Sequence, residues 1–275
     1  MRVLTQNVLG PAHHGWDRRL PALVAGLRAP APDVVALQEA VDVPELLGPG
    51  WYEAWHSRRD DDGTGAVLAS RWPIGAVHEV DGRVTGRARE LRWSGTVVAE
   101  VRAPDPIGPF LAVHHKPLHR LDGELERELQ AVAAARLVEA LAPDPDRHVV
   151  LLGDFDARPD SAGLRFWTGR QSLHGMSVAY HDAWETAHGD DPGHTFTPDN
   201  PLVQVGDFHL ARGRRIDYVL VRGRPQGPTL QVRACERTLV EPVDGVQASD
   251  HYGVLAELVV PERAPGTQGV LAPER

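Results

Sequence analysis

The sequence predicts an α/β fold in which a two-layered β core is flanked by helices. Two segments, VVALQE (34–39) and VVLLGD (149–154), have the pattern of buried strands that end in a carboxylate. Each follows an amphipathic helix, and each helix follows a strand that ends in polar residues. Two such strand–helix–strand halves would deliver their polar side chains to one edge of the core, where sheets of this type bind ligands.

The first half is predicted from its apolar spacing. A short apolar strand covers residues 2–9, and Asp17 opens a helix whose buried residues are three and four positions apart. This buried face contains Leu20, Leu23, Val24 and Leu27. Residues 33–39 form a buried strand that ends at Glu39. Further strands, with the charged loop SRRDDDGTG among them, are expected at residues 51–56, 65–70 and 74–80.

The second half repeats this order. Residues 90–102 and 109–116 are expected to form a hairpin, and a long helix follows at residues 122–142. The apolar face of this helix is expected to contain Leu121, Leu125, Leu129 and Val132. The segment HVVLLGDFD (148–156) is another buried strand, and it ends in acids.

The rest of the chain is expected to contain a short helix near residues 160–168 and then a loop-rich stretch to residue 213. The final strands are expected at residues 215–222, 229–240 and 251–260. Because no linker divides the chain, we expect a single domain over residues 1–260, followed by a flexible C-terminal tail over residues 261–275.

Composition excludes several classes of protein. The 275 residues are 42% hydrophobic and 24% charged, which excludes a disordered or collagen-like chain. The net charge of −9 disfavours a protein whose main task is to bind polyanions, although a local basic patch is compatible with it. A single cysteine, Cys235, excludes a disulfide framework and a cysteine-based zinc ribbon. We expect a cytoplasmic protein, because the sequence shows neither a signal peptide nor an apolar run that could span a membrane.

The segment GDFDARPDS (153–161) gives the strongest chemical signal. Asp154 and Asp156 follow a wholly apolar strand, and two carboxylates this close raise each other's pKa unless a cation lies between them. Mg²⁺ prefers carboxylate oxygens, with water completing its coordination shell. The alternative interpretation is a turn with two solvated acids.

Two later segments combine acids with a histidine. The motif SDHYGV places Asp250 beside His251 at the start of an apolar strand, where they can supply a metal ligand and a general acid. The motif RRIDYVLV places Asp217 inside an apolar strand, and a buried acid needs a partner. His251 is the expected partner, because a hydrogen-bonded acid fixes the tautomer of a histidine and stabilises its charged form. Arg215 or another arginine is the alternative partner.

Together with TQNVL (5–9) and LQEA (37–40), these motifs resemble the endonuclease/exonuclease/phosphatase superfamily. This superfamily includes deoxyribonuclease-like nucleases, apurinic endonucleases, neutral sphingomyelinases and inositol-polyphosphate phosphatases. The motifs occur in the family's order across nearly the whole chain, and GAVLAS (65–70) and VHHKP (113–117) also fit this order. The resemblance implies a four-layer α/β sandwich, in which two packed mixed β-sheets are flanked by helices.

The resemblance also implies a Mg²⁺- or Mn²⁺-dependent hydrolase that cleaves phosphoester bonds. The metal-binding residues would be Asn7, Glu39 and Asp250. The catalytic residues would be His115, Asp154, Asp156, Asp217 and His251. Asp154 would orient or deprotonate the attacking water. His115, and His251 oriented by Asp217, would stabilise the charge that builds up on the phosphoryl oxygens.

Two departures from the family's pattern affect these assignments. The family usually has asparagine where this chain has Asp156, so the role of this residue is open. The segment VHHKP offers two adjacent histidines, and strand alternation allows only one of them to face the site. Aligning the segment as a polar residue followed by histidine selects His115, with His114 as the alternative.

The sequence leaves three functions open and predicts no oligomeric state. A hydrolase of small or lipid phosphodiesters or phosphomonoesters fits the net charge of −9 and the nearly lysine-free composition. A DNA or RNA nuclease would need a basic groove beside the site. Two arginine groups, both interleaved with acids, could form one: Arg83, Arg87, Arg89 and Arg92, and Arg212, Arg214 and Arg215. A binding module that has lost catalysis conflicts with the complete set of acids and histidines.

Overall fold

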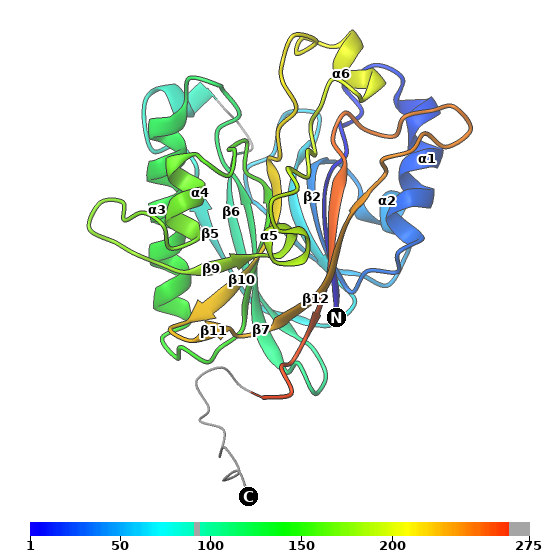
Figure 1. Cartoon of the computed structure of the whole chain (residues 1–275). Helices are drawn as coiled ribbons and strands as arrows, with labels where there is room; N and C mark the ends of the chain where they lie inside the picture. The colour runs from blue at the N-terminus through cyan, green and yellow to red at the C-terminus, as the bar shows by residue number, and fades with distance from the viewer. Residues whose placement is uncertain (91–93, 264–275) are drawn as a thin grey trace, which may run out of the picture.

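Two mixed β-sheets pack face to face in the computed structural model, which describes residues 1–90 and 94–263 of the chain (Figure 1). The first sheet has the strand order β12–β13–β1–β2–β4–β3. In this order its strands are Gln231–Thr238, Gly253–Val259, Arg2–Asn7, Val34–Ala40, Gly65–Ser70 and Tyr52–Trp55. The second sheet has the order β11–β10–β8–β7–β6–β5, and β9 also pairs with β10. Its strands, with β9 last, are Gly227–Pro228, Asp217–Arg224, Val149–Asp154, Pro109–Lys116, Gly95–Arg102, Ile74–Asp81 and Tyr180–Asp182.

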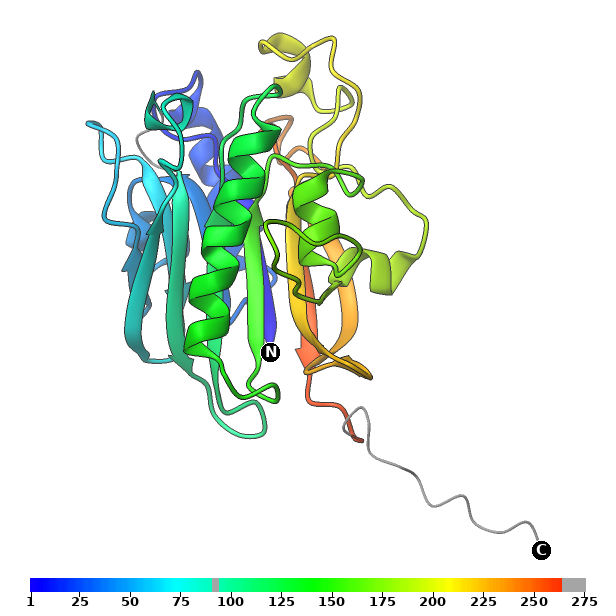
Figure 2. The same ribbon diagram turned by 90° about the vertical axis from the view of Figure 1, so that its left-hand side faces the viewer.

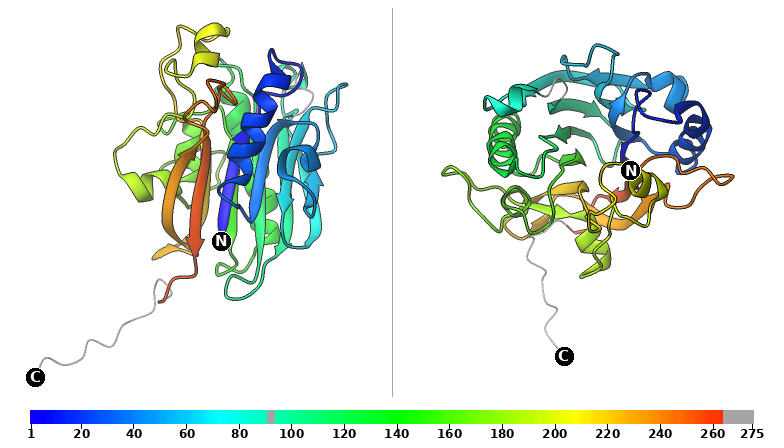
Figure 3. Two further views of the ribbon diagram at one scale, coloured as in Figure 1. Left: turned by 90° about the vertical axis from the view of Figure 1, so that its right-hand side faces the viewer. Right: turned by 90° about the horizontal axis from the view of Figure 1, so that it is seen from above.

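Helices cover the outer faces of the two sheets, so the molecule has four layers (Figures 2 and 3). Helices α1 and α2 lie on the first sheet, and α3 and α4 lie on the second. The helices are, from α1 to α6, Trp16–Arg28, Val43–Leu47, Glu124–Leu141, Ala162–Trp167, Ala183–His188 and Pro201–Val205, and Arg87–Glu90 forms a 3₁₀ turn. None of the helices in the described ranges is long and apolar enough to cross a membrane. This architecture confirms the predicted four-layer α/β sandwich.

Apolar clusters fill the spaces between these layers. The cluster between the two sheets takes residues from both, such as Val34 and Val150. A second cluster joins α1 to the first sheet, where Leu23 packs with Leu37. A third joins α3 and α4 to the second sheet and includes Val138. The two sheets therefore share one core, and each carries its helices on a core of its own.

Most elements lie where the sequence predicts them. The predicted strand over 90–102 begins at Gly95 in the structure, and its residues 91–93 lie outside the described residues. The predicted tail lies outside them as well from residue 264 onward. The stretch that the sequence predicts as loop contains β9 and two short helices, α5 and α6. The differences therefore concern short elements and strand ends.

The apolar face predicted for the long helix is correct only in part, because Val132 is buried and Leu129 half-buried but the first two leucines are exposed. Leu121 and Leu125 have 66% and 57% of their surface exposed, and Leu121 precedes the first residue of α3. The buried face of α3 instead carries small residues, including Ala131, Ala134 and Ala135. Small side chains allow a helix to pack closely on a sheet, and the alanines form this contact together with the valines and two later leucines of α3.

Each sheet contains one parallel strand pair connected through a helix, and these two units are the predicted halves. Strands β1 and β2 are parallel and connect through α1, and β7 and β8 are parallel and connect through α3. The two strands of each parallel pair end on the same side of their sheet. In Figure 1 both pairs end at the upper edge of the molecule. The polar residues that end these strands are therefore brought together.

Candidate active site

The ends of the two parallel strand pairs meet at a cavity of about 310 Å³. Six of the eight predicted site residues line this cavity: Asn7, Glu39, Asp154, Asp156, Asp250 and His251. Of the other two, Asp217 contacts His251, and His115 lies elsewhere. The cavity is thus built from both halves of the fold and from the loop that precedes β13.

Asn7, the last residue of β1, connects the two halves of the cavity. Its Nδ2 donates hydrogen bonds to Glu39 Oε1 at 3.0 Å and to Asp154 Oδ2 at 3.1 Å. Its Oδ1 accepts a hydrogen bond from the backbone N–H of Leu9 at 3.0 Å, which fixes the plane of the amide. Ser249 Oγ donates to the backbone carbonyl of Asn7 at 2.7 Å. This last bond ties the loop before β13 to the same strand end.

Glu39 and Asp250 are the carboxylates that could hold a metal ion. Burial opposes ionisation of Glu39, but hydrogen bonds from His13 and Asn7 and the charge of Lys116 outweigh it and lower its pKa. Burial raises the pKa of Asp250, and the charge of Glu39 adds to that shift. A divalent cation would relieve this repulsion, and carboxylate oxygens are the ligands that Mg²⁺ prefers. The residues present therefore fit a hard divalent cation.

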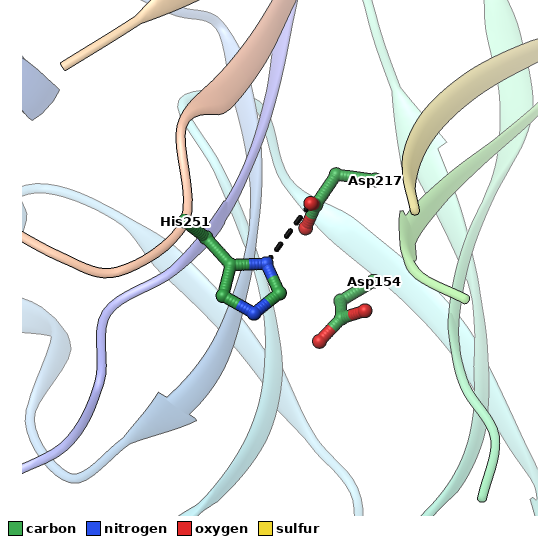
Figure 4. Close-up of side chains that lie close together, drawn as sticks. All are labelled: Asp154, Asp217 and His251. Atoms are coloured by element: carbon green, nitrogen blue, oxygen red, sulfur yellow. Dashed lines mark hydrogen bonds and ion pairs between the residues drawn. The ribbon is translucent and has the colours of Figure 1, made fainter. Parts of the chain in front are cut away.

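A second group of acids and histidine lies close by. Asp154, Asp217 and His251 have potential ligand atoms within 4.8 Å of one another (Figure 4). His251 Nδ1 lies 3.0 Å from Asp217 Oδ2, so this ring nitrogen already has a partner. Burial by itself lowers the pKa of His251, but the charges of Asp217 and Asp154 outweigh it and raise this pKa to about 10. The group thus places a protonated imidazole near two carboxylates, with Nε2 left as a possible donor to a ligand.

The pairing of Asp217 with His251 confirms the partner predicted from the sequence. Asp217 is the first residue of β10 and lies opposite Asp154 of β8 in the strand register. Its alternative partner, Arg215, forms an ion pair with Asp182. Burial raises the pKa of Asp217, and the charge of His251 counteracts this shift.

Lys116, the last residue of β7, is a site residue that sequence reasoning missed. Its Nζ contacts Asp154 Oδ2 at 2.7 Å and also forms an ion pair with Asp156. Its side chain is only 3% exposed, yet it lines the cavity. Burial favours the neutral amine, but the charges of Asp154 and Asp156 outweigh it and raise the pKa of Lys116. The ammonium group of Lys116 therefore stays protonated and places a positive charge in the cavity wall.

The structure does not bring His115 to the cavity, which corrects its expected position. Its Nδ1 lies 2.7 Å from Thr96 Oγ1, and its ring packs edge-on against Phe155 and Trp167. Burial lowers the pKa of His115 to about 3, so the ring is neutral. A neutral histidine in this apolar layer cannot stabilise charge on a phosphoryl group in the cavity.

The prediction for His115 failed because it assigned the side chains of β7 to the wrong faces of the strand. Side chains of a strand alternate between its two faces, so His114 and Lys116 share one face and His115 points to the other. His114 Nε2 lies 2.8 Å from Gln38 Nε2 of the first sheet, deep between the sheets, so His114 does not reach the cavity either. A signal for Lys116 was available, because it is the only lysine in the sequence and directly follows the two histidines.

Asp156 follows β8 on an irregular backbone with a φ of 50°. Aspartate and asparagine adopt this left-handed conformation more readily than most residues. The backbone N–H of Asp156 donates to Asp154 Oδ1 at 3.1 Å, and its carboxylate pairs with Lys116. Burial and the charge of Asp154 raise the pKa of Asp156. The acid that departs from the family's usual asparagine is thus a partner of the unexpected lysine.

Comparison with known families agrees with this geometry. A sequence profile described as the Endonuclease/Exonuclease/phosphatase family matches residues 4–251, which is most of the chain. The chain belongs to this family. Enzymes of the family are phosphoesterases that depend on divalent metal ions. A search of curated proteins finds no match.

Solved structures of the family share the fold. A humanized D. rerio TDP2 with 14 mutations is 18% identical with a TM-score of 0.71, covering 94% of this chain and 98% of that chain. An endonuclease/exonuclease/phosphatase from Bacteroides vulgatus is 21% identical with a TM-score of 0.70, covering 94% and 98%. ANGEL2, a 2′,3′-cyclic phosphatase solved with adenosine-2′,3′-vanadate, is 15% identical with a TM-score of 0.71, covering 94% of each chain. At 15–21% identity these likenesses show the fold alone and do not identify a substrate.

Proposed function

We propose that the protein is a Mg²⁺- or Mn²⁺-dependent phosphoric ester hydrolase that acts on a small or lipid phosphoester. One observation carries this proposal. One cavity is bordered by two partly buried acids suited to a cation, by an ionised aspartate and by two positively charged side chains: Glu39, Asp250, Asp154, Lys116 and His251. A phosphoryl group placed there would meet a metal ion, a water-orienting carboxylate and two hydrogen-bond donors at once.

Glu39 and Asp250 would hold the metal ion, with Asn7 positioning Glu39. When bound, the ion would polarise a phosphoryl oxygen and stabilise charge on the leaving oxygen. The sequence prediction of Asn7 as a direct ligand becomes a positioning role in this proposal. Its two N–H bonds hold Glu39 and Asp154 in place across the cavity.

Asp154 would orient the attacking water. Burial opposes its ionisation, but the charges of Lys116 and His251 outweigh it and lower the pKa of Asp154. The carboxylate therefore stays ionised and can accept a hydrogen bond from water. Its Oδ2 already accepts bonds from Lys116 and Asn7, and its Oδ1 accepts the backbone N–H of Asp156. These bonds fix its direction, which a water-orienting group requires.

Lys116 and His251 would stabilise the charge that develops on the phosphoryl oxygens. The Nζ of Lys116 can turn one N–H towards substrate while it keeps its aspartate contacts. Nε2 of the protonated His251 ring is a second donor, since Asp217 engages Nδ1. Lys116 thus takes the role that the sequence assigned to His115.

A nuclease is the second candidate, because D. rerio TDP2 has been solved with a single-strand DNA product. The expected basic grooves give it little support. Arg83 pairs with Asp81, and Arg87 pairs with Asp122. Arg92 lies outside the described residues, Arg215 pairs with a buried acid, and among the described members of the two groups only Arg214 lines the cavity. A small substrate fits a protein of net charge −9 better.

The test is an activity screen of the purified protein with Mg²⁺ and with excess EDTA. The substrates are bis-p-nitrophenyl phosphate, nucleotide esters, phospholipid vesicles and plasmid DNA. We expect EDTA-sensitive hydrolysis of a small or lipid ester, and Asp154→Asn is the matched inactive control. Salt-sensitive plasmid nicking would favour the nuclease. Binding without turnover of any substrate would favour a binding module and contradict the proposal.

We also propose that residues 1–260 act as a single domain, because the two sheets share one apolar cluster. The cytoplasmic location stays a prediction.

A further inference from the structure

A second hollow of about 360 Å³ adjoins the active-site cavity. Asp156 and Arg214 line both spaces, so they mark the junction between them. Glu39 and Asp250, the proposed metal ligands, line the first cavity but not the second hollow. A substrate whose phosphoester lies at the metal can therefore extend past Arg214 into the second hollow.

The backbone holds Arg214 firmly at this junction. The Arg214 N–H donates to the Phe196 carbonyl at 2.7 Å, and the Phe196 N–H donates to the Arg214 carbonyl at 3.0 Å. The N–H of Thr195 donates to the same Arg214 carbonyl at 2.9 Å. Arg214 stands three positions before Asp217 in the sequence, so its place is also tied to the Asp217–His251 pair.

The guanidinium of Arg214 has aromatic neighbours but no acidic one. Its Cζ lies 5.0 Å from the centre of the Phe196 ring and 5.9 Å from that of Phe208. Within residues 1–90 and 94–263, no carboxylate pairs with it, and its buried Nε has no hydrogen-bond acceptor. Aromatic rings hold a guanidinium without using its N–H groups. Within the same described residues no hydrogen bond engages the terminal Nη groups, so they can donate to an acceptor on a ligand that occupies the adjoining spaces.

Other charges near the junction are less suited to an anion. Arg127 and Arg158 line the second hollow, but each already pairs with an acid of that hollow, at 2.9 and 3.1 Å. Asp60 and Asp62 line the first cavity and would repel a negative group. Arg214 is therefore the positive charge of the junction that remains available for an anionic ligand.

We propose that Arg214 binds a second phosphate group of the substrate, adjacent to the phosphoester that is cleaved. The planar fork of a guanidinium matches two phosphate oxygens. Phe208 is 40% exposed and offers an apolar surface for the part of the substrate between the two phosphates. The inference rests on the proposed function, because it places the cleaved phosphoester at Asp154 and His251. It names the substrate class as a phosphoester that carries two phosphates.

The test uses two esters that differ only in the second phosphate. These are the 5′-p-nitrophenyl phosphate of thymidine and the same ester with a 3′-phosphate. With saturating Mg²⁺, we expect the wild-type protein to have the higher kcat/KM for the bisphosphate. Arg214→Gln should lower the ratio of the two kcat/KM values by about 10- to 100-fold, which corresponds to one lost contact between charged groups. Arg214→Lys keeps the charge without the fork and should retain part of the preference.

Arg158→Gln is the matched control, because it removes a positive charge that lines the same hollow but already has a partner. Equal falls of the ratio in the Arg158 and Arg214 variants would overturn the inference, because they would show that any positive charge of this hollow attracts the second phosphate equally. Equal losses on both esters in Arg214→Gln would also overturn it, because Arg214 would then act at the cleaved phosphate or in the fold.

A binding experiment separates failure of this inference from failure of the proposed function. Calorimetry compares thymidine 3′,5′-bisphosphate with thymidine 5′-monophosphate and needs no turnover. Suppose that neither ester is hydrolysed, but the bisphosphate binds more tightly and Arg214→Gln removes this preference. The second-phosphate site then stands and the hydrolase proposal fails. Equal affinity of the wild-type protein for both nucleotides overturns the site.

Discussion

The two strand–helix–strand halves of the molecule end at one cavity but bring different groups to it. The first half contributes Asn7 and Glu39, an amide and a carboxylate suited to a metal ion. The second half contributes Asp154, Asp156 and Lys116, in which the positive charge is part of the chain. The two halves therefore differ in the source of positive charge. The first half would need a bound metal ion, and the second half carries the ammonium group of Lys116.

The first strands of the two halves, β1 and β7, present their last polar residues to the same side. On β1, Thr5 and Asn7 face the space between the sheets, as His114 and Lys116 do on β7. Thr5 and His114 both contact Gln38 Nε2, at 3.2 and 2.8 Å. Lys116 thus occupies the place in the second half that Asn7 occupies in the first. The comparison predicts that changes in the first half alter metal use and that changes in the second alter the rate.

The largest expected effect is that of Asp154→Asn. This change keeps the shape of the side chain and removes the charge that orients water, so kcat should fall by about 10²–10⁴-fold at saturating Mg²⁺. Steady-state kinetics over a range of Mg²⁺ concentrations measures the effect. Recovery of the rate at high Mg²⁺ would assign Asp154 to the metal and break the division between the halves.

A smaller loss is expected for Lys116→Gln, with His115→Gln as the matched control on the opposite face of the same strand. Removing one preorganised donor should lower kcat by about 10²–10³-fold, and the His115 change should cost less than about tenfold. Kinetics and thermal unfolding of both variants separate catalytic from structural losses. The reverse order of the two effects would restore the role that the sequence assigned to His115.

The sequence predicts most of the site because its apolar strands end in polar residues at the edge of the sheets where the cavity lies. Asn7, Glu39 and Asp154 need only the position of a strand end, and hydrophobic runs mark strand ends well. His251 and Asp217 are predictable as a pair because a buried acid needs a partner. These residues lie where their motifs place them.

Other features depend on information that hydrophobic runs do not carry. The run His114, His115, Lys116 is polar at every position, so alternation gives two possible phases and the pattern cannot choose between them. The buried face of α3 follows small residues, which a search for leucine spacing overlooks. The bridge between Phe196 and Arg214 joins two loop segments through backbone hydrogen bonds, which leave no residue pattern.

Glu39→Gln tests the first half. Because the amide is a weaker ligand for Mg²⁺, activity at low Mg²⁺ should fall by about 10- to 100-fold and recover in part at high Mg²⁺. Lys116→Gln should show no such recovery, so the two variants together sharpen the comparison. Titration of activity with Mg²⁺ provides the measurement. Full activity of the wild-type protein in excess EDTA would refute the metal site altogether.

Asp217→Asn tests the Asp217–His251 pair, which joins the start of β10 in the second sheet to the loop before β13 in the first. The pKa of His251 is raised to about 10, so its charged donor is present below that pH and is lost as the pH rises through it. Without the charge of Asp217, only Asp154 and Asp250 oppose the effect of burial, so this pKa should fall and the alkaline limb of the pH–rate profile should move to lower pH. The rate at neutral pH should fall by about tenfold. An alkaline limb that does not move would show that His251 keeps its proton without Asp217.

The smallest effect is expected for Asp156→Asn. Lys116 keeps Asp154 as a partner in this variant, and asparagine tolerates the left-handed backbone at this position. The new amide can also donate a hydrogen bond to substrate. We therefore expect kcat within about tenfold of the wild-type value, well below the losses expected for orienting or donor groups. Kinetics at saturating Mg²⁺ measures it.

The acidic limb of the same profile gives the sharper result. Asp156 places a negative charge beside Asp154, which favours protonation of the pair, so its removal should move the acidic limb to lower pH. In Lys116→Gln the two buried carboxylates face each other without their cation. Adding Asp156→Asn to that variant relieves the repulsion, so the double variant should be more active than Lys116→Gln alone. Strictly additive losses would show that Asp156 does not act through Lys116. A folded Asp156→Asn protein that is inactive at every pH and Mg²⁺ concentration would instead make Asp156 a catalytic residue in its own right.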